Sequence, residues 1–153
     1  MKVAVGFDHC GAKLRSIVLD ELRVGRHEVI DVGTHTDEAE VDFPGKADEV
    51  AHLIVSAQAE RGILVGSSGV GVTIAANKIR GVRACLCHDV YSARQGVEHD
   101  NMNVLCLGAD IIGSFLAREL IQSFLDAEFD GAEPHRRRLG MIEAIENRQQ
   151  ENA

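Results

Sequence analysis

Short, uninterrupted apolar runs recur along the 153-residue chain, and segments with helix-like spacing separate them. Runs of this kind predict strands buried on both faces, because a strand with one face in solvent alternates apolar and polar residues. Strands that alternate with helices form a parallel sheet with helices on both sides. The chain is therefore predicted to be a doubly wound α/β domain. The expected strands are 3–7, 28–32, 62–65, 82–87 and 104–107.

The segments between these runs are expected to be helical. The periodicity predicts helices over 11–24, 47–58, 72–79, 91–98, 111–125 and 136–148. Neither a repeat nor a low-complexity linker divides the chain. We therefore expect one domain over residues 1–148 and a frayed tail over 149–153.

The composition narrows the class of protein. A formal net charge of −8 and a pI near 5.3 argue against nucleic-acid binding. No apolar run approaches the ~18–20 residues of a membrane span, and the N-terminus lacks the layout of a signal peptide. A cytoplasmic protein is expected. Cys85, Cys87 and Cys106 lie in apolar runs and are expected to be buried thiols, whereas Cys10 lies in a loop. With no CxxC pair, a zinc or redox site has little support.

The segment 62–78 joins a predicted strand to a predicted helix through a loop of small residues. Its sequence is GILVGSSGVGVTIAANK, and the loop runs from Gly66 to Gly71. Backbone N–H groups at the start of a helix have no intrahelical acceptor and can hold an anionic oxygen, either a phosphate or an enediolate. A plain strand-to-helix turn is the alternative for a lone glycine-rich loop.

Other polar groups follow predicted strands directly. They are Asp8-His9, His88-Asp89 and Gly108-Ala109-Asp110. The carboxyl ends of parallel strands share one edge of a sheet, where ligands collect, so these groups should converge with the loop 66–71. An Asp and a His there can hold sugar hydroxyls or assist proton transfer. Asp8 could equally cap a helix.

Two further groups lie outside these strand ends. His99 is expected in a surface loop between a helix and the last strand. The segment His135–Arg138 places cations at the start of a helix, where they oppose the helix dipole, and this favours an anion-binding purpose.

Two common site types do not fit. The segment after the first strand has no GxGxxG, and Ser68–Gly71 lacks the GK[ST] ending of a P-loop, so nucleotide binding is disfavoured. The chain also lacks the GxSxG elbow of a nucleophilic hydrolase.

Five motifs in order along residues 1–148 resemble ribose-5-phosphate isomerase type B and the related galactose-6-phosphate isomerase subunits. They are Asp8-His9-x-Gly11, Asp42-Phe43-Pro44, the run Ser68–Lys78, Tyr91-Ser92-Ala93 and Glu98-His99. The resemblance implies a Rossmann-like three-layer α/β sandwich with a five-stranded parallel sheet. It also implies an aldose–ketose isomerase without metal or cofactor, converting ribose 5-phosphate to ribulose 5-phosphate through an enediolate. The implied assembly is a homodimer with shared active sites and a C-terminal helix for dimer contacts, with a tetramer as the alternative.

The resemblance also implies roles for individual residues. Asp8 and His9 would contact sugar hydroxyls and the phosphate end, with Ser67 beside them. Ser68 would assist the moving proton, and Gly69, Val70 and Gly71 would form the anion hole. His99 would open the sugar ring, and Arg138 of a partner subunit would bind the phosphate. Arg136 and Arg137, which follow His135, are expected to compensate for the family arginines that this chain lacks.

Several positions depart from the family pattern. Gly66 replaces the catalytic Cys of one branch, and Val72 replaces the Glu of another. Asp100 stands where Asn is usual, and Asp110 and Pro134 stand where the family has phosphate-binding arginines.

Neither usual base is present, so a carboxylate is expected to move the proton, Asp100 first and Asp8 second. Two alternatives stay open. The chain could isomerise a tetrose phosphate, a hexose phosphate or a free sugar, because a phosphate beside an unpaired Asp110 is penalised. It could also be a non-catalytic sugar-binding homologue.

Overall fold

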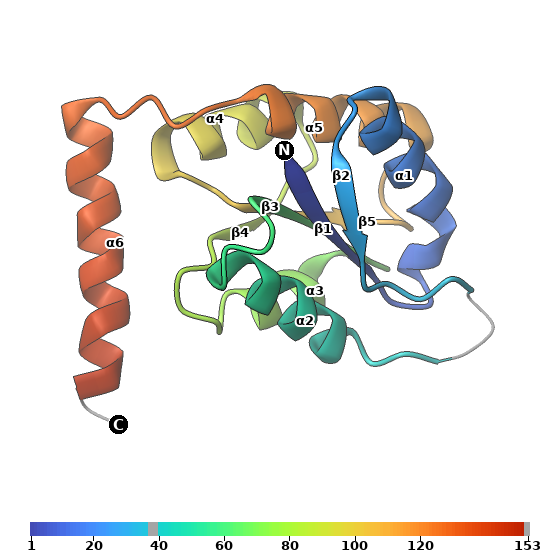
Figure 1. Cartoon of the computed structure of the whole chain (residues 1–153), viewed down its shortest axis with the longest axis horizontal. Coiled ribbons are helices and arrows are strands. Elements are labelled where there is room, and N and C mark those ends of the chain that lie inside the picture. Colours follow the sequence, from blue (N-terminus) through green and yellow to red (C-terminus); the bar gives the residue numbers. More distant parts are fainter. Residues whose placement is uncertain (37–39, 152–153) are drawn as a thin grey trace.

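The predicted parallel sheet is present. The structure, a computed structural model, describes residues 1–36 and 40–151. Five parallel strands pair in the order β2-β1-β3-β5-β4 (Figure 1). The strands are β1 (Lys2–Phe7), β2 (Glu28–Asp31), β3 (Arg61–Gly66), β4 (Ala84–Leu86) and β5 (Val104–Gly108). The fold class is therefore the α/β sandwich that the apolar runs predict.

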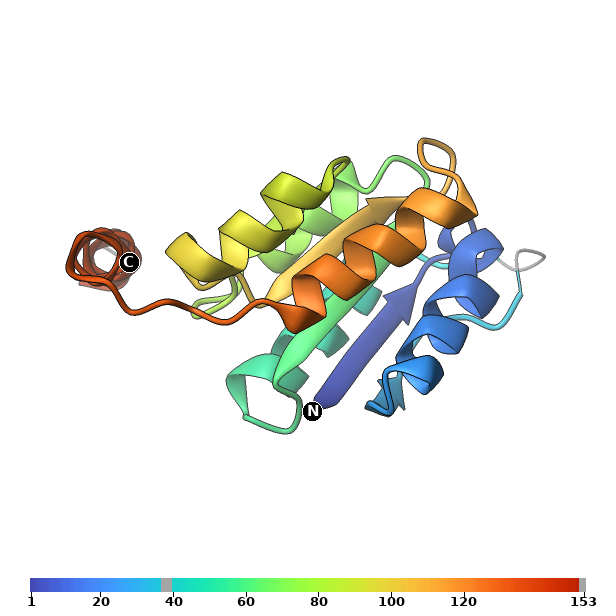
Figure 2. The same cartoon turned by 90° about the horizontal axis from the view of Figure 1, so that it is seen from above.

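Helices cover both faces of this sheet. They are the 3-10 turn η1 (Gly11–Leu14), α1 (Arg15–Val24), α2 (Phe43–Val55), α3 (Val70–Ala76), α4 (Val90–Asp100), α5 (Ser114–Asp126) and α6 (Glu133–Glu151). Figures 1 and 2 show α1, α4 and α5 over one face and α2 and α3 over the other. In the described part of the chain, no helix has the length and apolar character to cross a membrane.

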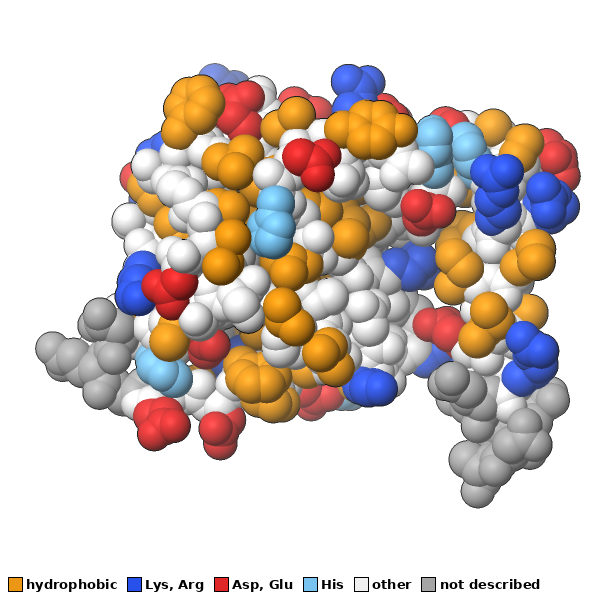
Figure 3. Space-filling view, turned by 180° about the vertical axis from the view of Figure 1, so that it is seen from behind, with side chains coloured by type: hydrophobic (Ala, Val, Ile, Leu, Met, Phe, Trp, Pro, Cys, Tyr) orange, Lys and Arg blue, Asp and Glu red, His pale blue; other side chains and the backbone are white. Residues whose placement is uncertain are grey.

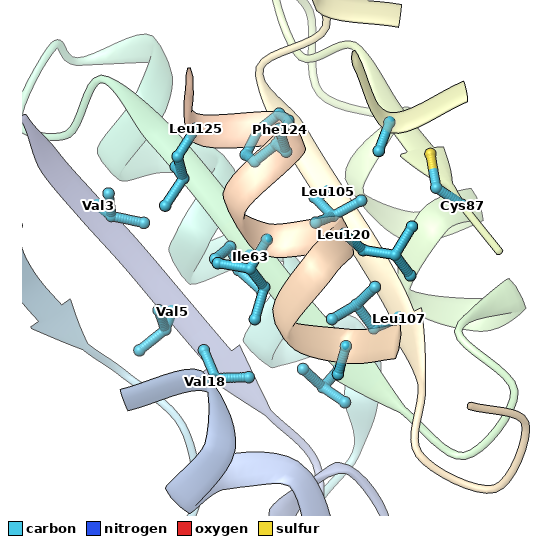
Figure 4. Close-up of a cluster of buried hydrophobic side chains, with 14 of the residues drawn as sticks. Val3, Val5, Val18, Ile63, Cys87, Leu105, Leu107, Leu120, Phe124 and Leu125 are labelled. Carbon is cyan, nitrogen blue, oxygen red and sulfur yellow. The ribbon is translucent and has the colours of Figure 1, made fainter. Parts of the chain in front are cut away.

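The core is aliphatic and lies on both sides of the sheet. Figure 4 shows the larger cluster, in which Ile63 and Leu105 of the central strands face Leu120 and Phe124 of α5. All four side chains are fully buried. On the other face a smaller cluster packs α2 and α3 against β1, β3 and β5. This two-sided burial is why the strands read as continuous apolar runs.

Several predicted element boundaries are corrected by the structure. The helix expected over 11–24 begins as the 3-10 turn η1. The helix expected from residue 47 begins at Phe43, because Asp42 is its extended N-cap residue and Pro44 fits the first turn. The helix expected from residue 111 begins at Ser114.

Two predictions about individual side chains are also wrong. His99 lies in the last turn of α4, not in a loop. Cys85 is exposed, because β4 is a short edge strand and leaves this position open, whereas Cys87 and Cys106 are buried as expected.

The C-terminal helix α6 lies to one side of the sheet and its covering helices (Figures 1 and 2). It contacts them at a few points, among them the Gly81 N–H, which donates to Glu146 at 3.3 Å. It continues to Glu151, beyond the predicted end at residue 148. Its apolar residues Met141, Ile142 and Ile145 are exposed. A cavity of about 460 Å³ separates Ile142 from the edge of the sheet at Cys85.

Candidate functional site

The sheet order creates a cleft between β1 and β3. The chain crosses from β1 to β2 on one side and then returns to β3 on the other side of β1. Ligands in open α/β sheets bind where the direction of winding changes, at the carboxyl ends of the strands. Here this position holds a cavity of about 160 Å³. It is lined by Asp8, Phe43, Gly66, Ser67, Ser68, Gly69, Gly71 and Val72.

The loop after β3 is shaped by Gly69. Gly69 has a φ of 78°, the left-handed region that favours glycine. A Cβ atom at Gly69 would lie 2.6 Å from Leu86 Cδ1 and 2.9 Å from the carbonyl oxygen of Leu107. α3 then begins at Val70, whose N–H donates to Ser68 Oγ at 3.2 Å. The Val70 N–H is thus engaged within the loop. The first N–H groups of a helix have no acceptor earlier in that helix, so the backbone donors that can serve the cavity are those of Gly71 and Val72, which line it.

Asp8 brings a carboxylate to the same cavity. Its side chain is 7% exposed. One oxygen, Oδ1, accepts the Gly11 N–H at 2.6 Å, so the capping role considered from the sequence is present. The other oxygen, Oδ2, lies 3.3 Å from the point where a Cβ at Gly66 would stand. Because Gly66 has no side chain, Oδ2 faces the loop.

His9 follows Asp8 at the carboxyl end of β1. The Val41 N–H donates to His9 Nδ1 at 3.2 Å. A neutral imidazole that accepts at Nδ1 carries its proton on Nε2. Nδ1 also lies 3.4 Å from the Val41 carbonyl oxygen. Nε2 therefore donates to a ligand oxygen in the tautomer that accepts from Val41 N–H, and accepts in the other tautomer.

Asp110 is not the unpaired carboxylate expected from the sequence. Lys13 Nζ donates to its Oδ1 at 2.6 Å, and Ser67 Oγ donates to its Oδ2 at 2.8 Å. These two bonds, that from Lys13 foremost, lower the pKa of Asp110. The ionised carboxylate is thus balanced by a lysine, and the expected penalty for a nearby phosphate is reduced.

The remaining predicted site residues form a second group at the opposite edge of the sheet. β5 begins beside the start of β3, so the end of α4, just before β5, lies at the amino ends of the strands. His99 and Asp100 are there. The Asp130 N–H donates to the Glu98 carbonyl at 3.0 Å, which brings the start of α6 to the same edge with Arg137 and Arg138. In Figure 2 the strand arrowheads point away from α6.

The structure therefore brings seven of the predicted residues together and separates four. Asp8, His9, Ser67, Ser68, Gly69, Val70 and Gly71 lie at the carboxyl edge of the sheet. His99, Asp100, Arg137 and Arg138 lie at the other edge, at the end of α4 and the start of α6.

Two residues near the cavity, Phe43 and Lys13, were not singled out as site residues in the sequence, and Asp110 was named there by its place at this edge of the sheet, not as a site residue. Phe43 covers the loop: a Cβ at Gly71 would lie 2.8 Å from its ring. Its motif with Asp42 and Pro44 was the available signal. Asp110 follows a strand directly, and this position predicts the carboxyl edge of the sheet, where the residue lies. No local sequence pattern identifies Lys13 as a site residue, because its role depends on a contact with Asp110, 97 residues away.

An enclosed carboxylate that faces a loop of backbone N–H groups can take a proton from carbon while the loop stabilises the resulting oxyanion. This arrangement suits a class of reaction, the transfer of a proton beside a carbonyl group.

The chain belongs to the Ribose/Galactose Isomerase family, whose model matches residues 3–142. It is similar to ribose-5-phosphate isomerase B of Escherichia coli, with 38% identity over 96% of this chain and 97% of that protein. It is also similar to D-erythrulose-4-phosphate isomerase of Pectobacterium atrosepticum, with 36% identity over 97% and 99%. The structure of Clostridium thermocellum ribose-5-phosphate isomerase B superposes with a TM-score of 0.93 at 40% identity, over 97% of this chain and 99% of that one.

Proposed function

We propose that this protein interconverts ribose 5-phosphate and ribulose 5-phosphate through an enediolate held at the loop 67–71. The observation that carries the proposal is the position of the Asp8 carboxylate, which faces the loop across the 160 Å³ cavity. The family membership and the ribose-5-phosphate isomerases among the relatives support the substrate class.

Asp8 is the proposed base. In the open-chain aldose, Asp8 Oδ2 takes the proton from C2, and negative charge develops on the carbonyl oxygen at C1. The N–H groups of the loop stabilise that charge. The proton then returns to C1, while the hydroxyl proton on O2 passes to O1 and leaves a ketone. Asp8 is preferred to Asp100 because Asp8 lines the cavity itself, whereas Asp100, like His99, would have to come from another copy of the chain.

We propose that the active site is completed by a second copy of the chain in a homodimer. One subunit would supply Asp8 and the loop 67–71, and its partner would supply His99, Arg137 and Arg138. The separation of these groups within one chain supports this arrangement. The exposed apolar residues of α6 and the cavity beside them offer a surface that a partner subunit could cover. α6 would then make the dimer contacts.

The shared site can be tested by mixing two inactive variants. Asp8→Asn and His99→Asn each remove one half of the site, so a heterodimer of the two has one intact site and one doubly altered site. Random pairing puts about half of the chains in heterodimers, and about a quarter of wild-type activity should return. The measurement is ketose formation by co-expressed, purified protein.

The control pair is Asp8→Asn with Gly69→Ala, because both changes lie in the same half of the site and their heterodimer has no intact site. Recovery with this pair, or none with the first pair, would contradict a shared site.

The substrate assignment is tested with a panel of sugars in the presence of a chelator. Ribose 5-phosphate should give the highest kcat/KM among tetrose, pentose and hexose phosphates and free aldoses. Inorganic phosphate should inhibit competitively, since Lys13 and the arginines of α6 would attract it. A higher kcat/KM with a tetrose phosphate would favour the activity that one relative's name carries. Activity on free sugars alone, with no phosphate inhibition, would reject a sugar phosphate as substrate.

A further inference from the structure

Two histidines and an aspartate meet where the end of α4 lies against the start of α6. His99 belongs to the last turn of α4, Asp130 to the connection after α5, and His135 to the first turn of α6. His135 Nδ1 lies 2.9 Å from both carboxylate oxygens of Asp130. The rings of His99 and His135 stack with centroids 3.9 Å apart and an interplanar angle of 20°. Histidine side chains are visible at the surface near the start of α6 in Figure 3.

The spacing of these side chains suits a small divalent ion. One ligand atom from each residue can be chosen so that all three lie within 4.8 Å of one another. Ligand atoms around a tetrahedral zinc ion are about 3.3 Å apart, given metal–ligand distances near 2.0–2.1 Å. His135 and Asp130 would need to separate by about 0.4 Å, and His99 would need to turn out of the stack and approach by at most about 1.5 Å.

Neighbouring groups contact two of the three ligands. The Gln95 amide nitrogen of α4 lies 2.8 Å from His99 Nδ1. An amide nitrogen only donates, so the neutral ring carries its proton on Nε2 in this arrangement. An ion at Nε2 therefore requires the Gln95 amide to turn, so that its oxygen accepts a hydrogen bond from Nδ1–H. The Ala132 N–H donates to Asp130 Oδ1 at 2.9 Å. Such outer hydrogen bonds are typical of metal ligands, because they fix ring orientation and tautomer. Partial exposure of the Asp130 and His135 side chains leaves a path for an ion and room for a water ligand.

The local charge is mixed. Asp130 supplies the carboxylate of this group. Arg136 and Arg137 follow His135 and weaken the attraction for a cation, but Arg137 is paired with Glu133 at 3.8 Å. Two imidazoles and one carboxylate form a donor set that suits zinc better than magnesium or calcium.

We propose that His99, Asp130 and His135 bind a divalent ion of the zinc type, with water as a fourth ligand, and that this ion inhibits the enzyme. The ion bridges α4 and the start of α6. Because His99 is one of its ligands, this imidazole can no longer act on the sugar ring. Binding of the ion does not depend on the proposed isomerase activity, whereas the inhibition rests on it. The ion has no part in the isomerisation itself.

Zinc and cobalt binding to the full-length protein, stripped with a chelator, tests the site. Calorimetry should show one zinc ion per chain, and cobalt should give the intense visible absorption of a tetrahedral centre with nitrogen and oxygen ligands. Asp130→Asn and His135→Gln should each weaken zinc binding at least tenfold. His52→Gln is the matched control, because His52 pairs with Asp48 at 3.2 Å on α2. Within the described residues, that pair has no third ligand of this kind.

The outcomes separate the parts of the proposal. An absence of zinc binding, or binding that neither variant weakens while both remain folded by circular dichroism, would overturn the site. Binding to the wild type without loss of isomerase activity would overturn the inhibition and leave the site. Binding by a protein that isomerises none of the sugars would support the site and reject the proposed function.

Discussion

Replacing Gly69 with alanine should lower kcat/KM for the isomerisation by about 10²–10³, the usual cost of losing one oxyanion donor. The left-handed backbone at this position disfavours any side chain, and the added Cβ would press on Leu86 and on the backbone of Leu107. The loop must therefore move, and its N–H groups leave the positions that hold the enediolate. Steady-state kinetics on ribose 5-phosphate measure the effect.

The same variant should lose about 1–3 kcal/mol of unfolding free energy, the cost of a strained backbone conformation. Urea unfolding measures this loss. Gly45→Ala is the matched control: Gly45 lies in α2, and a Cβ there meets no atom within 4 Å. That change should leave activity intact and stability equal or slightly higher. Full activity of the Gly69 variant would show that the loop backbone does not hold the reacting oxygen.

Replacing Asp8 with asparagine should reduce kcat by about 10²–10⁴ while the protein stays folded. The side-chain oxygen of asparagine can still accept the Gly11 N–H that Asp8 Oδ1 accepts at 2.6 Å. An amide cannot take a proton from C2, so the chemical step fails and the turn η1 persists. Exchange of the C2 proton of the substrate with solvent measures that step directly.

Asp100→Asn is the comparison that decides between the two candidate bases. It should keep proton exchange within a few-fold of wild type, because the proposed base, Asp8, lines the cavity and is unchanged. If exchange instead persists in Asp8→Asn and is lost in Asp100→Asn, then a partner subunit supplies the base and the assignment of Asp8 is wrong.

The strands were predictable because the signal that identifies them is local. Ile63, Leu64 and Val65 are all fully buried, as an uninterrupted apolar run implies for a central strand. Helix starts were less accurate. The Asp42-Phe43-Pro44 signal for a helix start was present in the sequence, but the apolar periodicity pointed to residue 47. The turn η1 depends on the hydrogen bond between Asp8 and Gly11, which apolar spacing does not report.

The site was predictable in part for the same reason. Asp8 and the loop 67–71 each follow a strand, and parallel strands bring such residues to one edge. The placement of His99 in a surface loop was wrong. Its position in the last turn of α4 puts it at the other edge of the sheet. The pairing of Asp110 with Lys13 was missed, because two residues far apart in sequence meet only after the sheet and η1 are assembled.

The amino-acid sequence alone determined the parallel α/β class, the aliphatic core and the glycine-shaped loop, because burial on two faces and positive φ angles leave local patterns. Tertiary structure decided which polar groups face one another. It placed the Asp8 carboxylate across a cavity from the loop, paired Asp110 with Lys13, and set His99 beside His135 at the far edge. The proximity of these groups depends on strand order and on the path of α6. Both result from packing between segments distant in the chain.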